Sequence, residues 1–512
     1  MDASTENKPA NAAVRTRAQL GMAAPKVTVE AHVGGGLPRF NLVGLPEATV
    51  REARDRVHSA IENNQLRFPQ GRVVVNLAPA DLAKQGGRFD LAIAISLLAA
   101  TNQVPATHLH RFEFLAELGL YGALRHTRGV LPAALAMSDK GSILVVPEAN
   151  RSEAALISSR AVVPCAHLTD VLALLADPSK PQGAGARTSP RPEPKEAVDL
   201  LSLVKGQRTA KRALQVAAAG GHHFLMVGPP GVGKTMLARS LLNLLPKLTE
   251  SQALEVAAIY SSAGLMRGAY EAIPWRDPHH SATAPAIIGG GGQASPGEAA
   301  LAHHGVLFLD EMPHFQPRVL NLLREPLESQ QASIARANYR VTYPANFQLI
   351  AAMNPCPAGR VCVQGACRCQ PRHVQAYQAR ISGPLLDRID MQLWLPSLPK
   401  EVLAERGEPA TDTAAQAAAV AAVRQRQVAR QGALNSQLAG PIAAKQAPID
   451  SAAQTLLTQA IDTYRLSGRS YHKIIKVAWT VSDLNQTEAI GVQEVAEALS
   501  YRAIDWEKMG GR

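Results

Sequence analysis

The chain has 512 residues, of which 46% are hydrophobic and 19% charged, and its formal net charge is +11. The longest apolar run, ten residues from Leu91, is too short for a membrane helix, and the polar N-terminus lacks the apolar segment of a secretory signal. We therefore expect a cytoplasmic protein that does not contact the membrane.

The first part of the chain predicts a polar tail and an α/β domain. Residues 1–14 are expected to be a disordered tail, and residues 15–176 the domain. Segments 26–33 and 72–79 are rich in β-branched residues and predict strands. Residues 177–196 are rich in Pro, Gly and Ser, which is typical of a linker. Between the two strands a helix is predicted whose apolar face consists of Val50, Ala53, Val57, Ala60 and Ile61.

The rest of the chain divides at about residue 396. Strands predicted at 224–227, 306–309, 347–352 and 391–395 favour an α/β domain over residues 197–395, whereas residues 396–512 favour helices. Residues 197–395 hold 18 Lys and Arg against 12 Asp and Glu, so more than half of the net charge lies there. Contact with a polyanion and an ordinary solvated basic surface both explain this charge.

A glycine-rich loop follows the strand at 224–227 and precedes a helix. Its pattern, GPPGVGKT, allows backbone N–H groups to face phosphates, and the helix N-terminus adds its positive end. Lys234 can reach the β- and γ-phosphates and Thr235 can hold Mg²⁺. The sequence therefore predicts a site for ATP and Mg²⁺ formed by Gly228, Pro229, Pro230, Gly231, Val232, Gly233, Lys234 and Thr235.

Two further strand ends carry polar residues suited to hydrolysis. The strand in GVLFLDE ends at Asp310 and Glu311. There, the first carboxylate can organise Mg²⁺ and the second can accept a proton from the attacking water. The strand in FQLIAAMNP ends at Asn354, whose amide can orient that water. A turn-capping role is the alternative for Asn354, but the two motifs upstream favour catalysis.

These motifs occur together with the more specific stretches RDPHHSATAPAIIGGGGQ, SGPLLDRID and NLAPADL. Over nearly the whole chain they resemble the magnesium-chelatase-like AAA+ ATPases of the ComM/YifB type. The resemblance implies a Lon-protease-like N-terminal α/β domain, an AAA+ P-loop α/β core and a C-terminal α-helical lid. It also implies a homohexameric ring. For the ComM branch, it implies a helicase that promotes branch migration on single-stranded or branched DNA during natural transformation.

The resemblance also assigns individual residues. Arg388 of LLDRID matches the arginine finger, which acts on the nucleotide of a neighbouring subunit, and Arg469 of LSGRS matches the second sensor arginine of the lid. Lys473 and Trp479 stand where arginines are expected, so the lid departs from the usual pattern. In the Lon-like domain, Arg88 of GGRFD replaces the nucleophilic serine, which excludes a Ser–Lys peptidase. A structural or DNA-contacting role remains for that domain.

Glycine also clusters outside the phosphate loop. Residues 287–298, IIGGGGQASPGE, lie where related ATPases insert a hairpin into the ring pore, and glycine permits the close approach of backbone to a ligand. A flexible surface loop is the alternative. A second hairpin is predicted at 333–347, where Arg336 and Arg340 either contact phosphates or lie on a solvated hairpin.

Four cysteines follow Asn354. Four thiolates within fourteen residues can satisfy tetrahedral Zn²⁺, although four unligated thiols in an Arg-rich loop are the alternative. The spacing C-x5-C-x4-C-x-C is not the usual paired C-x2-C. The candidate zinc ligands are Cys356, Cys362, Cys367 and Cys369.

The sequence therefore favours a hexameric ATPase that translocates on DNA. Two other functions remain open: a chelatase motor that inserts Mg²⁺ into a porphyrin with partner subunits, and a protein-remodelling ATPase without a DNA role.

Overall fold

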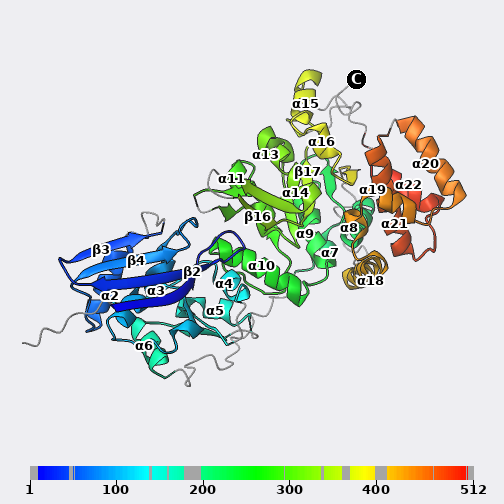
Figure 1. Ribbon diagram of the computed structural model, residues 1–512. Coiled ribbons are helices and arrows are strands. Elements are labelled where there is room, and N and C mark those ends of the chain that lie inside the picture. Colours follow the sequence, from blue (N-terminus) through cyan, green and yellow to red (C-terminus); the bar gives the residue numbers. More distant parts are fainter. Residues whose placement is uncertain are drawn as a thin grey trace, which may run out of the picture.

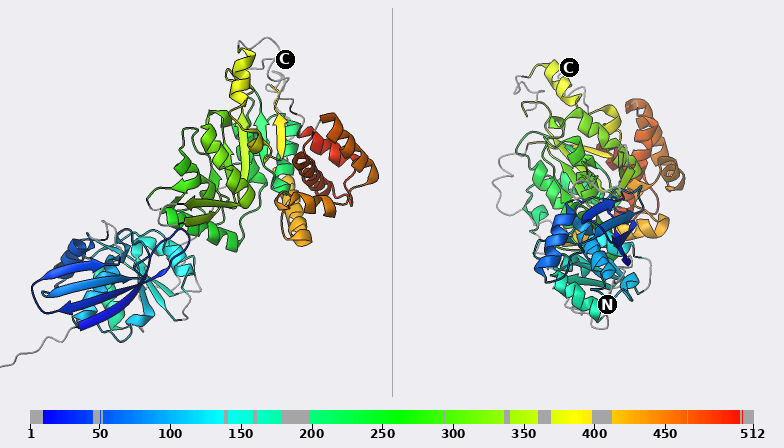
Figure 2. Two further views of the ribbon diagram at one scale, coloured as in Figure 1. Left: turned by 45° about the horizontal axis from the view of Figure 1, so that its top comes forward. Right: turned by 60° about the vertical axis from the view of Figure 1, so that its left-hand side comes forward.

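The computed structural model describes residues 10–44, 50, 52–137, 141–157, 161–177, 198–292, 294–335, 340–359, 369–397, 412–464, 466–502 and 504. The chain is elongated, and three units follow one another along it (Figures 1 and 2). We call them the N-terminal unit (residues 10–177), the central unit (198–397) and the C-terminal unit (412–504). Across the described chain, no helix combines the length and apolarity needed to cross a membrane.

A seven-stranded sheet forms the N-terminal unit, in the order β3-β4-β2-β1-β5-β8-β9. In β2 and β4 alternate side chains are buried, and Val29 lies opposite Leu77 in the antiparallel register. This alternation is typical of a sheet with one covered face, and it confirms the two strands predicted here. The strands are β1 (Ala10–Arg17), β2 (Lys26–Gly34), β3 (Arg39–Val43), β4 (Arg72–Ala78), β5 (Phe112–Phe114), β8 (Ile143–Pro147) and β9 (Ala161–Cys165).

Strand β1 corrects part of the expected tail. It begins at Ala10, within residues 1–14, and its buried Val14 pairs with Val29 of β2. The segment ANAAVRTR has few β-branched residues, so its conformation is determined by pairing with β2 and not by local preference. Residues 1–9, like residues 178–196 of the expected linker, lie outside the described residues.

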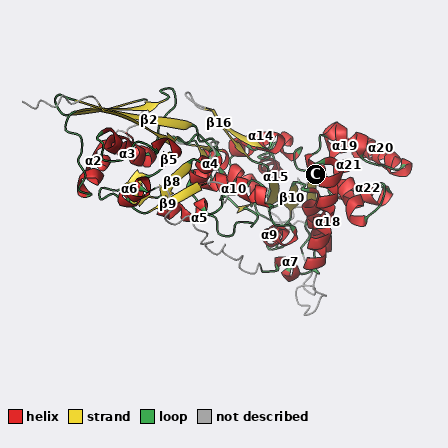
Figure 3. Ribbon diagram, turned by 60° about the horizontal axis from the view of Figure 1, so that its bottom comes forward, coloured by secondary structure: helices red, strands yellow, loops and turns green. Residues whose placement is uncertain are grey.

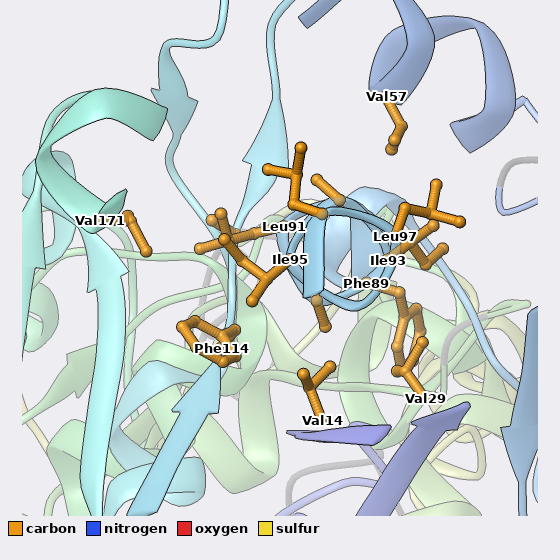
Figure 4. Close-up of a cluster of buried hydrophobic side chains, with 14 of the residues drawn as sticks. Val14, Val29, Val57, Phe89, Leu91, Ile93, Ile95, Leu97, Phe114 and Val171 are labelled. Atoms are coloured by element: carbon orange, nitrogen blue, oxygen red, sulfur yellow. The ribbon is translucent and has the colours of Figure 1, made fainter. Parts of the chain in front are cut away.

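Helices α2 (Ala53–Asn63) and α3 (Asp90–Ala100) cover the inner face of this sheet (Figure 3). Every residue of α3 is buried, as expected for a helix that is apolar on all sides. Figure 4 shows its side chains meeting Val14 and Val29 of the sheet on one side and Val57 of α2 on the other. All five residues of the predicted apolar face are fully buried. The described residues of this unit also form three shorter α-helices: α4 (Val130–Leu135), α5 (Arg151–Ala154) and α6 (Leu168–Ala176).

The central unit contains a parallel five-stranded sheet in the order β11-β14-β17-β10-β18. Its strands β10 and β14 are continuous, fully buried apolar runs, which suit parallel strands buried on both faces. β10 (Phe224–Val227) and β14 (Val306–Leu309) have the predicted bounds. β17 (Gln348–Met353) is shifted by one residue at both ends, and β18 (Met391–Trp394) ends one residue earlier than predicted. The short edge strand β11 (Trp275–Arg276) was not predicted.

Helices flank this sheet and form the whole described C-terminal unit. Those of the central unit are α7 (Leu200–Leu203), α8 (Arg208–Gly220), α9 (Lys234–Leu244), α10 (Glu250–Ala263), α11 (Ala284–Ile288), α12 (Glu298–Leu301), α13 (Pro317–Leu322), α14 (Arg324–Ser329), α15 (Pro371–Gln378) and α16 (Gly383–Leu386). Those of the C-terminal unit are α18 (Thr413–Gln431), α19 (Gly440–Gln446), α20 (Ser451–Tyr464), α21 (Gly468–Asn485) and α22 (Val492–Ser500). Both α18 and α21 pack against α8.

Helix α10 joins the central unit to the N-terminal unit (Figure 1). Its Val256 lies in one buried apolar cluster with Val130 and Leu144 of the N-terminal unit. Polar contacts surround this cluster: Gln19 donates to the Ser262 carbonyl at 2.8 Å, and the Leu131 N–H donates to Ser261 Oγ at 3.2 Å. A buried apolar contact with satisfied polar groups is typical of a fixed interface, so we expect the two units to move together.

Candidate active site

The predicted phosphate loop connects β10 to α9. Gly231 and Gly233 have φ values of +82° and +87°, a conformation that side-chain-bearing residues rarely adopt. Gly228 is needed for a different reason, because a Cβ there would lie 2.6 Å from the Leu395 carbonyl oxygen. The sequence forms this loop because its glycines lie at the positions where φ is positive or another strand comes close.

Lys234 and Thr235 begin α9 and point to neighbouring strand ends. Lys234 Nζ donates to the carbonyls of Gly228 and Pro229 and, at 2.9 Å, to Asn354 Oδ1. Thr235 Oγ1 donates to Asp310 Oδ2 at 2.7 Å. Burial lowers the pKa of the Lys234 ammonium, and the nearby carboxylates oppose this shift. The structure thus brings together the ends of β10, β14 and β17, which are spread over more than a hundred residues of the sequence.

These residues fit a nucleoside triphosphate and Mg²⁺. A cavity of about 400 Å³ is lined by the loop and by Asp310, Glu311 and Asn354. Cβ atoms built on Gly231 and Gly233 would have no neighbour within 4 Å, so the loop presents open backbone to this cavity. The hydroxyl of Thr235 and the carboxylate of Asp310 are the hard oxygen ligands that Mg²⁺ prefers.

One neighbour of this cavity was not assigned a role from the sequence. His280 Nδ1 lies 4.0 Å from Glu311 Oε2. The sequence did contain a signal for this position, the motif RDPHH, which begins at the last residue of β11. β11 is paired in parallel with β14, the strand that ends before Glu311. Parallel strands deliver their carboxyl ends to one edge of a sheet, so residues that follow β11 are expected beside Glu311.

Arg388 and Arg469 lie at the opposite edge of the sheet from Lys234. Both line a cavity of about 1400 Å³ beside His223 and Gln348, which lie at the amino ends of β10 and β17. Arg388 forms an ion pair with Glu328 and donates to the Pro384 carbonyl at 2.6 Å, and its buried Nε has no partner among the described residues. The two arginines therefore line one cavity, which is distinct from the cavity of the phosphate loop in their own chain.

Both predicted hairpins are present. Gly289 and Gly290 form β12, which pairs antiparallel with β13 (Ser295–Pro296), and β15 (Gln331–Ala335) pairs with β16 (Arg340–Pro344). The Tyr343 hydroxyl donates to the Ala294 carbonyl at 2.8 Å and connects the two hairpins. Arg340 is exposed, whereas Arg336 lies outside the described residues.

The N-terminal unit buries Arg88 where a peptidase nucleophile was considered. The Arg88 guanidinium donates to Gln19 Oε1 at 3.2 Å, and its Nε and second terminal nitrogen have no partner in the described structure. Burial lowers its pKa to about 10, which leaves it a cation at neutral pH. A buried guanidinium is no nucleophile, in agreement with the exclusion of Ser–Lys chemistry.

The cysteine cluster is described only in part. Cys356 is fully buried and Cys369 is partly buried, whereas Cys362 and Cys367 lie outside the described residues. The zinc site therefore stays a prediction, which elemental analysis of protein purified without chelator can decide.

Comparison with known proteins shows similarity along almost the whole chain. The family described as "Magnesium chelatase, subunit ChlI" matches residues 200–403. "Subunit ChlI of Mg-chelatase" matches residues 29–150, and "Magnesium chelatase, subunit ChlI C-terminal" matches residues 410–502.

Curated relatives extend this similarity. "Competence protein ComM" of Haemophilus influenzae is 44% identical over 498 residues, which cover 96% of this chain and 97% of the relative. "Uncharacterized protein YifB" of Escherichia coli is 44% identical over 500 residues, with the same coverage. "Lon protease 2" of Bacillus subtilis is 28% identical over 194 residues, which are 33% of this chain and 34% of that protein.

Proposed function

Because this chain belongs to the magnesium-chelatase-like AAA+ proteins of the ComM/YifB type, we propose that it is a homohexameric DNA helicase that promotes branch migration. Membership of the family implies an ATPase that uses ATP and Mg²⁺. The identity of the DNA substrate, the hexamer and the roles of single residues are our proposal.

The observation that carries the hydrolytic part is the convergence of three strand ends on the phosphate loop. We assign the phosphates to the loop and Lys234, and Mg²⁺ to Thr235 and Asp310. Glu311 accepts the proton of the attacking water, and Asn354, held at 2.9 Å from Lys234, orients that water. Phosphoryl transfer needs little covalent chemistry from the protein, so such positioning can supply most of the catalysis.

The positions of Arg388 and Arg469 support the proposal that the protein assembles into a ring. Arg388 and Arg469 line a cavity at the edge of the sheet opposite to the phosphate loop, so one chain cannot bring them to its own γ-phosphate. A second copy that docks this edge onto the phosphate loop would complete the site. Repetition of such a head-to-tail contact closes a ring, for which we propose six copies.

The DNA substrate is supported by the two connected hairpins, by the basic central unit and by the competence function in the name of one relative. We place DNA against the glycine hairpin, with Arg340 near a phosphate. Uptake of single strands during natural transformation creates branched joints, and a ring motor with these hairpins can move such a joint along the duplex.

The test is the ATPase rate with and without single-stranded and forked DNA, at several salt concentrations. We expect stimulation that weakens as salt rises, because phosphate contacts release counterions. The same ATPase measurement with unfolded protein in place of DNA tests the alternative function, protein remodelling. Stimulation by unfolded protein alone would favour protein remodelling, and stimulation by neither would contradict a motor that acts on DNA.

The three family descriptions favour a second candidate, a chelatase-type motor that works with partner subunits. This candidate differs from the helicase because its activity would require those partner subunits. If the purified chain unwinds forked DNA alone, this candidate is excluded.

A further inference from the structure

The segment that follows β11 passes directly beside the proposed catalytic base. Trp275 and Arg276 of β11 lie in parallel register with Val306 and Leu307 of β14. The chain therefore leaves β11 at the edge where β14 ends, and four residues later it places the His280 imidazole nitrogen Nδ1 4.0 Å from Glu311 Oε2. Strand pairing therefore brings this segment to the edge of the sheet that carries Glu311.

The turn that carries His280 is fixed by several contacts. The N–H of Ala282 donates to the His279 carbonyl at 2.9 Å, and the N–H of Ser281 donates to His279 Nδ1 at 3.3 Å. The two imidazole rings lie against each other, with centroids 4.1 Å apart. Arg239 of α9 donates a hydrogen bond to Asp277 at 3.0 Å, which links this segment to the helix that follows the phosphate loop.

Few contacts, by contrast, orient the side chain of Glu311. Its φ of +49° is unusual for a residue other than glycine, and such outliers often occur at functional sites. Its side chain is 52% exposed. Among the residues that the structure describes, no other basic group lies within ion-pair distance of its carboxylate. A general base must be held within reach of the water it activates, and His280 is the side chain in position to do so.

We propose that His280 is a positioning residue for Glu311: its imidazole restrains the carboxylate in the orientation that accepts the proton of the attacking water. The present separation exceeds a hydrogen bond, and contacts of this kind often tighten when substrate binds. The inference rests on the proposed role of Glu311 in ATP hydrolysis and adds the residue that orients it.

The test compares His280→Ala and His280→Gln with wild type in steady-state ATPase assays of the full chain. The alanine variant should lower kcat by up to about a hundredfold, the effect of a displaced catalytic group, and leave KM for ATP and the melting temperature unchanged. The glutamine variant keeps an N–H donor and should recover part of the loss. His110→Ala is the matched control, because this exposed histidine lies in the N-terminal unit and not in the central unit that carries Glu311.

Two results would overturn the inference. One is a kcat for His280→Ala within about twofold of wild type. The other is a loss of kcat that His280→Gln does not recover and that comes with a lower melting temperature, which would make His280 a structural residue. Glu311→Gln is measured in parallel. If Glu311→Gln is fully active, the proposed base is wrong; if it is inactive while His280→Ala is normal, only the role of His280 is wrong.

Discussion

Lys234 and Glu311 line the same cavity, but the proposed mechanism assigns them to different steps. Glu311→Gln keeps the loop and its lysine, so we expect ATP binding close to wild type and turnover lower by a factor of about 10² to 10⁴. Lys234→Ala removes the cation from the phosphates and should weaken binding itself. Equilibrium binding of a fluorescent ATP analogue and single-turnover hydrolysis distinguish the two. Hydrolysis by Glu311→Gln at the wild-type rate would show that the base is misassigned.

His303 gives the stability of the central unit a defined pH dependence. Its Nδ1 accepts the Asn346 N–H at 3.0 Å, which leaves Nε2 to donate to Glu255 at 3.2 Å. Burial, and then the adjacent His304, lowers the pKa of His303 to about 4 from an ordinary 6.5, although Glu255 opposes this shift. The unfolded chain therefore binds this proton first as the pH falls, so stability should be complete above pH 6.5 and decline down to pH 4.

Thermal melts of wild type and His303→Gln between pH 4 and 8 check this expectation. The amide oxygen of glutamine can still accept the Asn346 N–H, but the side chain does not titrate. We expect a melting temperature that falls on acidification in both proteins, with a smaller slope in the variant. An equal slope in both would mean that other groups account for the pH dependence.

At the scale of elements, the glycine hairpin has a base and a tip with different requirements. A Cβ at Gly289 would lie 2.7 Å from the Ser295 carbonyl oxygen and 2.8 Å from Ile334 Cδ1, whereas a Cβ at Gly292 would have no neighbour within 4 Å. We expect Gly289→Ala to distort the hairpin, spare basal ATPase and reduce DNA unwinding. Gly292→Ala is the matched control and should unwind more nearly as wild type does. Collapse of basal hydrolysis in Gly289→Ala would make the hairpin part of the active site.

The elements also show what the sequence could and could not predict. β10 and β14 were predicted with their bounds because a continuous apolar run between a turn and a motif allows little else. Residues 10–14 of β1 were assigned to a tail, since the partner that makes ANAAVRTR a strand is β2, which its own residues do not reveal. Likewise Lys234, Asp310 and Asn354 were assigned by motif. The proximity of His280 to Glu311 depends on strand order, which local patterns do not encode.

At the scale of the whole molecule, a site shared between chains predicts complementation. Arg388→Ala and Lys234→Ala should each be inactive alone, because every interface then lacks one half. In a mixture, some interfaces combine an intact Lys234 with an intact Arg388 of the neighbour. We therefore expect hydrolysis to recover partly and to depend on the mixing ratio. Absence of recovery at every ratio would argue against a finger that acts across subunits.

If Arg388 acts on the nucleotide of a neighbouring subunit as proposed, its placement opposite Lys234 predicts the kinetic order of the reaction. A solitary chain would hold two incomplete half-sites, so turnover per chain should rise with protein concentration and level off once interfaces are filled. At a low cellular concentration of the protein, the enzyme would then be inactive without any inhibitor. Abundance, or a DNA strand that gathers the copies, would act as the switch.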